Sequence, residues 1–180
     1  KEVPWWRTNY KGDEIHAVVD AIISEKLSNG TISKEFEQKF AEILGVPYAV
    51  AVPNGTLALT LALLAHNIGP GDEVIVCCRT WISPAHAPLV LGAKSVLVDC
   101  LSKRQVIDCQ QIENRITEKT KAIIAVHING RSVDMTTINQ IAKKHDLFVI
   151  EDGCQSFLSQ NLEGYLGTQS KAGCFSLGVT

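Results

Sequence analysis

The sequence lacks the features of several large classes of protein. Its charges nearly cancel, because 17 basic and 19 acidic residues give a net charge of −2. This balance gives no electrostatic reason to expect nucleic acid or an anionic membrane as a partner. No apolar run approaches the ~20 residues that span a bilayer, and the first ten residues lack the apolar core of a signal peptide. We therefore expect a cytoplasmic protein that binds small molecules or protein subunits.

Common catalytic and metal-binding motifs are also missing. There is no GxGxxG after a strand, no GxxxxGK(S/T), no HExxH and no GxSxG, so dinucleotide-binding, P-loop and serine-hydrolase functions lose their usual support. The five histidines show no ligand spacing, and the six cysteines contain no CxxC pair. We expect no metal site and no disulfide framework. Reduced, buried cysteines are favoured, because a free cysteine behaves as a small hydrophobic residue.

The hydrophobic pattern predicts an α/β fold. Two amphipathic helices are expected first, over Asp13–Lys26 and Lys34–Leu44. Short β-branched runs then predict strands, at Tyr48–Val52, Glu73–Cys77, Ser95–Asp99, Lys121–Val126, Phe148–Glu151 and Gly173–Leu177. Helical segments separate most of these runs, at Thr56–Asn67, Ile82–Leu91, Gln110–Thr117 and Met135–His145. Apolar strands that alternate with helices predict a mainly parallel sheet with helices on both faces.

In such a sheet, ligands bind beyond the carboxyl ends of the strands. There Asn54-Gly55-Thr56 precedes a helix that is apolar on nearly every side and is therefore expected to be buried. Its free amides and helix dipole would suit a phosphate. A simple turn in which Thr56 caps the helix explains the same residues. Glycosylation of this sequon, or of Asn29-Gly30-Thr31, would need an exposed loop in a secreted chain.

Polar and aromatic residues also follow other strands. Glu151 and Asp152 end one strand, and the alternation of side chains along a strand predicts that only one of them enters the site. A carboxylate there needs a cationic or donor partner, which a protonated heterocyclic nitrogen or a structural ion pair would supply. Gln155 would add a donor. Trp81 offers a flat face for an aromatic ring, although a core tryptophan fits its position equally well.

Together these positions resemble the DegT/DnrJ/EryC1/StrS family of sugar aminotransferases, which use pyridoxal 5'-phosphate (PLP). The matching segments cover almost the whole chain and are Phe36-Glu37 with Phe40-Ala41, Ala51–Leu63, Gly69–Ile75, Thr80-Trp81, Leu91–Asp99, Lys119–Met135, Val149–Ser156 and Gly173–Thr180. Several motifs in the same order are more specific than any one of them alone.

The resemblance implies a fold and a domain organisation. The fold would be that of the type I PLP-dependent transferases, with a mainly parallel, seven-stranded sheet in the large domain. Residues 1–12 would be an N-terminal segment, and residues 13–180 the N-terminal portion of the PLP-binding large domain. A small C-terminal domain would lie outside this chain. The polar stretch Asn161–Lys171 is expected to be a surface loop or hairpin.

The resemblance also implies how the cofactor is bound. Gly55 and Thr56 match the turn that binds the phosphate, with Asn54 shaping that turn, and Ser176 matches a serine that adds a phosphate contact. Trp81 matches the aromatic residue that stacks on the pyridine ring. No metal ion is implied.

Two groups would act directly on the chemistry of the ring. Asp152 matches the catalytic aspartate paired with the pyridinium nitrogen, and Gln155 matches the glutamine near the ring hydroxyl. The catalytic lysine that forms a Schiff base with the cofactor is expected directly after Thr180 and is not in the chain.

The resemblance also suggests Trp6, Asn29 and Ser33 as substrate residues. For Trp6, contact with a second subunit and packing against the large domain are equally open alternatives. The resemblance further implies a homodimer with shared active sites.

The implied reaction transfers an amino group from an amino acid, typically L-glutamate, to a nucleotide-linked keto sugar, and its product is an amino sugar for polysaccharide or antibiotic biosynthesis. Two alternatives remain open. A keto-deoxysugar 3-dehydratase of the same family uses pyridoxamine phosphate (PMP) and has histidine in place of the lysine. A non-catalytic PLP-binding sensor would keep the same cofactor site.

Overall fold

The computed structural model describes residues 10, 12–26 and 30–178. The chain divides into two compact units, one made of residues 1–51 with 179–180 and one made of residues 52–178. Each unit is described by itself below. Among the substrate residues suggested by the sequence, Trp6 and Asn29 lie outside the described residues.

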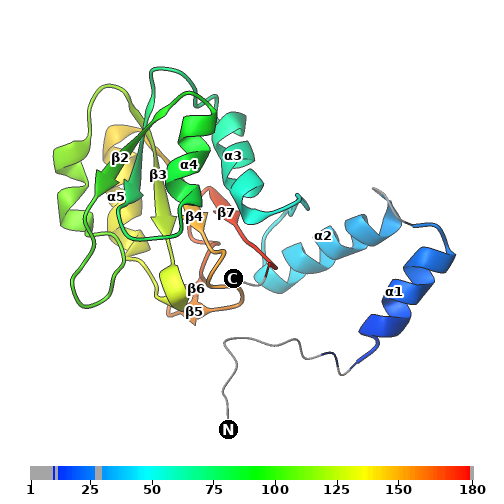
Figure 1. Cartoon of the computed structure of the whole chain (residues 1–180). Coiled ribbons are helices and arrows are strands. Elements are labelled where there is room, and N and C mark those ends of the chain that lie inside the picture. The colour runs from blue at the N-terminus through cyan, green and yellow to red at the C-terminus, as the bar shows by residue number, and fades with distance from the viewer. Residues whose placement is uncertain (1–9, 11, 27–29, 179–180) are drawn as a thin grey trace, which may run out of the picture. The chain divides into compact units, whose positions relative to one another are not determined.

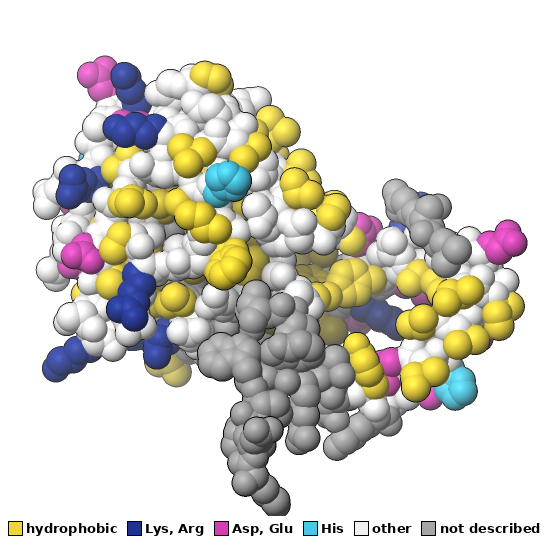
Figure 2. All heavy atoms as spheres, viewed as in Figure 1, with side chains coloured by type: hydrophobic (Ala, Val, Ile, Leu, Met, Phe, Trp, Pro, Cys, Tyr) yellow, Lys and Arg dark blue, Asp and Glu magenta, His cyan; other side chains and the backbone are white. Residues whose placement is uncertain are grey.

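The first unit contains the two helices that open the chain. Helix α1 spans Glu14–Ile23 and helix α2 spans Thr31–Leu44 (Figure 1). Helix α2 ends at Gly45, whose φ of 68° is the left-handed conformation that glycine adopts without strain. Helix α1 buries none of its residues, and Figure 2 shows hydrophobic side chains gathered along it. Both predicted helices are confirmed.

The second unit is an α/β layer structure. Its five parallel strands are β1 (Glu73–Cys77), β2 (Lys94–Val98), β3 (Thr120–Val126), β4 (Phe148–Asp152) and β7 (Ala172–Cys174). They lie in the order β2-β1-β3-β4-β7 (Figure 1). The predicted fold class is therefore confirmed. Among the described residues this sheet has five strands, rather than the seven that the resemblance implied for a whole large domain.

Helices cover both faces of this sheet. Helices α3 (Gly55–Ala65) and α4 (Ser83–Val90) pack on one face, where Leu59 and Leu63 meet Ile150 in one apolar cluster. Helix α5 (Met135–His145) packs on the other face, where Ile138 meets Val149. Neighbouring residues of β4 therefore belong to different cores, as the alternation of side chains along a strand requires.

Three local predictions were wrong or incomplete. Residues Tyr48–Val52 form no strand, because Tyr48 and Val50 are 86% and 78% exposed and the described residues offer them no neighbouring strand. Residues Gln110–Thr117 do not form an α-helix. They contain two short 3₁₀ helices, Cys109–Gln111 and Glu113–Arg115, and the side chain of Asp108 caps the first by accepting a hydrogen bond from the amide of Gln110.

Helix α3 is also less buried than its composition predicted. Three leucines on one side of it, Leu57, Leu61 and Leu64, are 40%, 44% and 53% exposed. Composition alone does not reveal which sides of an apolar helix have a neighbour. Strands Gln160–Asn161 (β5) and Gly164–Tyr165 (β6) form an antiparallel pair, which confirms the predicted hairpin. Among the described helices, none is long and apolar enough to cross a membrane.

A buried carboxylate ties this hairpin region to the sheet. Glu151 is fully buried in β4, and its carboxylate accepts hydrogen bonds from the backbone amides of Gly167 (2.8 Å) and Gln169 (2.7 Å). It also lies 3.0 Å from Nε2 of the buried His127. Nδ1 of His127 accepts a hydrogen bond from the amide of Val133 (3.2 Å). Nε2 therefore carries the hydrogen atom and donates a hydrogen bond to Glu151. Three segments of the chain therefore meet at one side chain, namely β4, the turn after β3 and the residues that follow the hairpin.

We predict that Glu151→Gln destabilises the protein by ~2–4 kcal/mol. The glutamine amide has one oxygen for two backbone donors, and its NH₂ group would face a donor. The free energy of unfolding, measured by chemical denaturation, tests this. Glu113→Gln is the matched control, because Glu113 forms exposed ion pairs with Lys144 and His145 and such pairs contribute little. Equal stability of the two variants would contradict the prediction.

Candidate active site

At the carboxyl edge of the sheet, strands that follow one another in the sequence lie on opposite sides of β1. From β1 the chain continues to β2 on one side, and it then crosses to β3 on the other side of β1. In open parallel sheets, the crevice at such a point is the usual place for a ligand. The residues that follow β1, β4 and β7, and the start of α3 beside them, are therefore the candidates.

The amino end of α3 has free amides. Asn54 is the residue that caps the helix, since its side chain accepts a hydrogen bond from the amide of Leu57 (2.9 Å). The alternative in which Thr56 caps the helix is therefore wrong. Within the described part of the chain, no hydrogen bond satisfies the amides of Gly55 and Thr56. Two free amides at the positive end of an 11-residue helix suit an anion such as phosphate.

The backbone at Gly55 lies close to the turns after β4 and β7. A Cβ atom added to Gly55 would lie 2.5 Å from Sγ of Cys154 and 3.2 Å from Cβ of Ser176. Any larger residue would have to displace one of these neighbours. The structure therefore brings Gly55 and Ser176 together, as the phosphate-binding hypothesis requires.

The hydroxyl groups near α3 were only partly foreseen. Oγ1 of Thr56 lies 2.7 Å from Oγ of Ser83, the first residue of α4, so a hydrogen bond joins the starts of both helices. Thr80 carries the one buried side-chain oxygen without a hydrogen-bond partner among the described residues. A buried hydroxyl without a partner is costly and suits a polar ligand. The contact of Ser83 and the buried hydroxyl of Thr80 were not predicted, because a lone serine or threonine has no distinctive pattern in a sequence.

Asp152 is the carboxylate that remains available at the end of β4. It is 5% exposed, and its Oδ1 accepts a hydrogen bond from the amide of Cys154 (3.0 Å). Burial raises the pKa of Asp152, and the hydrogen bonds from Cys154 oppose this rise only in part. A cationic partner would therefore stabilise its ionised form.

Glu151 and Asp152 point to opposite faces, as predicted. Glu151 follows the face of Val149, which packs against α5, whereas Asp152 follows the face of Ile150, which packs against α3. The three hydrogen-bond donors around Glu151 occupy it in the structure. Asp152 is the one that lies on the side of the free amides of α3.

Gln155 holds the neighbouring strand end in place. Its Oε1 accepts a hydrogen bond from the amide of Asn129 (3.0 Å), which follows β3. Because the oxygen is used in this way, the NH₂ group of Gln155 is the end that remains for a ligand oxygen.

Trp81 is not a core residue. It follows β1 by four positions and is 62% exposed. This exposure excludes the alternative of a buried tryptophan and leaves its indole face accessible to an aromatic ligand.

Other predicted or nearby residues do not join this group. Ser33 lies on α2, in the other compact unit, so its place near a substrate stays a prediction. Trp6 and Asn29 are outside the described residues, as is Thr180, after which the lysine is expected. Lys171 precedes β7 and lines an open hollow at the opposite, amino edge of the sheet, together with Lys121. Lys171 therefore lies at the edge of the sheet opposite the candidate site.

These residues fit PLP in its three chemical parts. The amides of Gly55 and Thr56 with the hydroxyl of Ser176 suit a phosphate, and the buried carboxylate of Asp152 suits a protonated ring nitrogen. The exposed Trp81 suits the flat ring.

Known proteins resemble the chain over most of its length. GDP-perosamine synthase from Escherichia coli O157:H7 is 41% identical over 177 residues, which are 98% of this chain and 49% of that protein. The spore coat polysaccharide biosynthesis protein SpsC of Bacillus subtilis is 38% identical over 93% of this chain and 43% of its own length. The chain thus spans about half the length of the curated relatives it matches, or less.

Solved structures agree with this result. The aminotransferase from Psychrobacter cryohalolentis has a TM-score of 0.80 at 39% identity, over 86% of this chain and 39% of its own. The structure of ntda from Bacillus subtilis with bound cofactor PMP has a TM-score of 0.81 at 34% identity, over 86% and 36% of the two chains. The family model named "DegT/DnrJ/EryC1/StrS aminotransferase family" matches residues 9–178. With the motifs and the fold in agreement, the chain belongs to the DegT/DnrJ/EryC1/StrS aminotransferase family.

Proposed function

We propose that the chain is part of a PLP-dependent aminotransferase that transfers an amino group from L-glutamate to a nucleotide-linked keto sugar. The observation that carries this proposal is the meeting of three groups at one edge of the sheet, namely the free amides of α3, the buried carboxylate of Asp152 and the turn that carries Ser176. Similarity to GDP-perosamine synthase supports a GDP-linked sugar as substrate.

The residues of the chain have separate tasks in this proposal. The amides of Gly55 and Thr56 and the hydroxyl of Ser176 bind the phosphate and so anchor the cofactor. Trp81 covers one face of the ring, and the NH₂ group of Gln155 donates to the ring hydroxyl. When bound, PLP supplies an electron sink for the reacting carbon.

Asp152 tunes this chemistry. Its carboxylate accepts a hydrogen bond from the protonated ring nitrogen and stabilises the positive charge there. Burial raises the pKa of Asp152. The positive charge of a bound ring would oppose this rise and stabilise the ionised form of Asp152. The amide of Cys154 orients the carboxylate by donating a hydrogen bond to Oδ1. A lysine directly after Thr180 would carry the proton during the transfer.

We also infer the setting in which the protein works. Residues 1–12 would be an N-terminal segment, residues 13–180 the N-terminal portion of the large domain, and a small C-terminal domain would complete the protein. Two copies would share active sites in a homodimer. A cytoplasmic location is supported by the six cysteines, none of which is paired in a disulfide.

The experiment that tests the function uses the full-length protein with PLP, L-glutamate and a GDP-linked keto-deoxy sugar. We expect a GDP-amino sugar and 2-oxoglutarate in equal amounts, detected by mass spectrometry, and no product when L-glutamate is omitted. A deoxygenated keto sugar without net amino transfer would instead indicate a dehydratase. Bound cofactor with no reaction with L-glutamate would indicate a sensor.

We predict that Asp152→Asn lowers the rate of the half-reaction with L-glutamate at least about a hundredfold, because a neutral amide does not stabilise the charged ring. The fold should persist, since asparagine has nearly the same shape. Stopped-flow measurement of cofactor absorbance gives the rate. Asp134→Asn is the matched control, since Asp134 caps α5 and asparagine caps a helix equally well. A normal rate in Asp152→Asn would refute the role assigned to it.

We predict that Gly55→Ala weakens PLP binding roughly tenfold or more, since crowding of this kind costs ~1–3 kcal/mol. The added Cβ would lie 2.5 Å from Sγ of Cys154 and would push the phosphate-binding turn away from Ser176. Titration of apoprotein with PLP measures the affinity. In the control Gly69→Ala, nothing lies nearer than 3.9 Å to the added atom. Unchanged affinity in a folded Gly55→Ala variant would rule out this site for the phosphate.

A further inference from the structure

A second group of reactive side chains lies at the carboxyl edge of the sheet, at the ends of β1 and β2. Cys78 follows β1, and Asp99 and Cys100 follow β2. The two strands are paired with Cys77 opposite Val98, and the amide of Cys78 donates to the carbonyl of Val98 (2.8 Å). The parallel register therefore places Cys78 beside Asp99.

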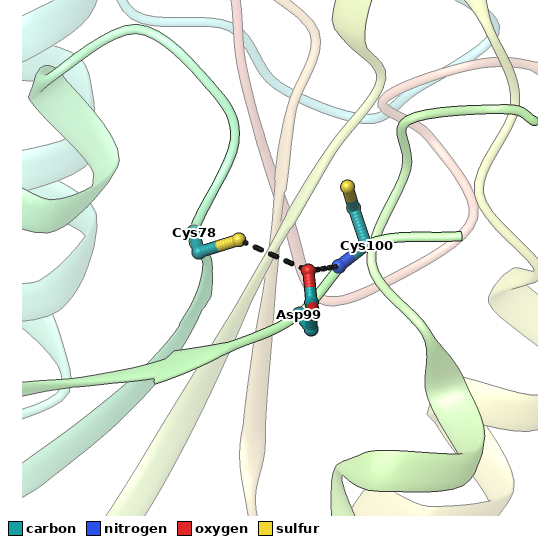
Figure 3. A group of neighbouring side chains, drawn as sticks. All are labelled: Cys78, Asp99 and Cys100. Carbon is teal, nitrogen blue, oxygen red and sulfur yellow. Dashed lines mark hydrogen bonds between the residues drawn. The ribbon is translucent and has the colours of Figure 1, made fainter. Parts of the chain in front are cut away.

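Figure 3 shows the thiol of Cys78 pointing to the carboxylate of Asp99, which also contacts the backbone nitrogen of Cys100. The thiol of Cys78 donates a hydrogen bond to Oδ1 of Asp99 over 3.4 Å. The same oxygen accepts a hydrogen bond from the amide of Cys100 (2.7 Å). One ligand atom from each residue, the two sulfur atoms and a carboxylate oxygen, lies within 4.8 Å of the others.

The backbone around the group is held in place. Cys100 forms an isolated β-bridge with Ile107, and the amide of Leu101 donates to the carbonyl of Val106 (2.9 Å). The amide of Asp108 donates to the carbonyl of Asp99 (2.9 Å). These contacts fix the backbone at the start of the loop after β2, which carries two of the three side chains.

The distances suit a small, sulfur-binding cation. Zn–S bonds are ~2.3 Å and Zn–O bonds ~2.0–2.2 Å long, so two ligand atoms of one tetrahedral ion lie roughly 3–4 Å apart. The 3.4 Å between Sγ of Cys78 and Oδ1 of Asp99 falls in this range. Cys78 and Asp99 are exposed and Cys100 is half-buried, so an ion has access from solvent.

We propose that Cys78, Asp99 and Cys100 bind a divalent cation of the zinc class, with a water molecule as the fourth ligand. Binding forms two metal–sulfur bonds and one metal–oxygen bond, and the two thiol protons leave to solvent. The cation takes the place of the hydrogen bond between Cys78 and Asp99. No electron transfer is involved.

The proposed metal site has no residue in common with the proposed cofactor site, but one connection of the chain carries residues of both. Cys78 begins the connection from β1 to α4, which also carries Thr80 and Trp81. A bound ion would fasten the start of this connection to the end of β2. The inference does not depend on the proposed aminotransferase activity, because it rests on the three side chains alone.

We expect the reduced, full-length holoenzyme to bind Co²⁺, used as a spectroscopic substitute for Zn²⁺, at this site. Difference spectra against the metal-free protein should show thiolate-to-cobalt charge-transfer absorption that saturates with the metal. Competition between Zn²⁺ and a chromophoric chelator then gives the zinc affinity. Either variant, Cys78→Ser or Cys100→Ser, should lower that affinity by roughly a hundredfold. Loss of a residue that merely hydrogen-bonds a metal-coordinating side chain already lowers metal affinity about 10–100-fold.

The double variant C78S/C100S identifies the ligands. It should lose the charge-transfer absorption, whereas the matched control Cys109→Ser, which changes a half-buried cysteine outside the group, should keep it. Cofactor absorbance and circular dichroism show that each variant is folded. Absence of the absorption in the reduced protein would overturn the proposal. Its persistence in the double variant would do the same, since other residues would then hold the metal.

Discussion

The buried carboxylate of Glu151 is the interaction on which the arrangement of the candidate site depends. A charge with no exposure to water is stable only when hydrogen-bond donors replace the water, and here His127, Gly167 and Gln169 supply them. These donors come from the ends of β3 and of the hairpin region. The end of β4 is thereby fixed against its neighbours, and with it the position of Asp152.

The two carboxylates of β4 are adjacent in the sequence but lie in different environments on opposite faces of the sheet. Two segments other than β4 supply the donors of Glu151, whereas the donors to Asp152 come from Cys154 alone among the described residues, and Asp152 points to the face of α3. On that face the start of α3 has free amides, and Gly55 lets it approach the turn after β4. A site for a molecule with a phosphate at one end and a cationic ring nitrogen at the other follows from this arrangement.

Much of the fold could be predicted from the sequence, because hydrophobic periodicity reflects which side of an element is buried. Strand Glu73–Cys77 and helix Met135–His145 have the same bounds in the structure as in the prediction. The prediction failed at Tyr48–Val52, where a β-branched run has no neighbouring strand among the described residues. A strand pattern specifies a side-chain alternation but not a partner, and hydrogen bonds to a partner are what make a strand.

The amino-acid sequence by itself determined the family, the α/β class and the residues around which a cofactor site was sought, because these follow from motifs and periodicity. The tertiary structure decided which of them meet. It placed Ser176 against Gly55, joined Thr56 to Ser83, and brought Cys78 beside Asp99 and Cys100 across two paired strands. Such contacts join residues far apart in the chain, and only the register of the parallel sheet and the packing of helices on it bring those residues within bonding distance.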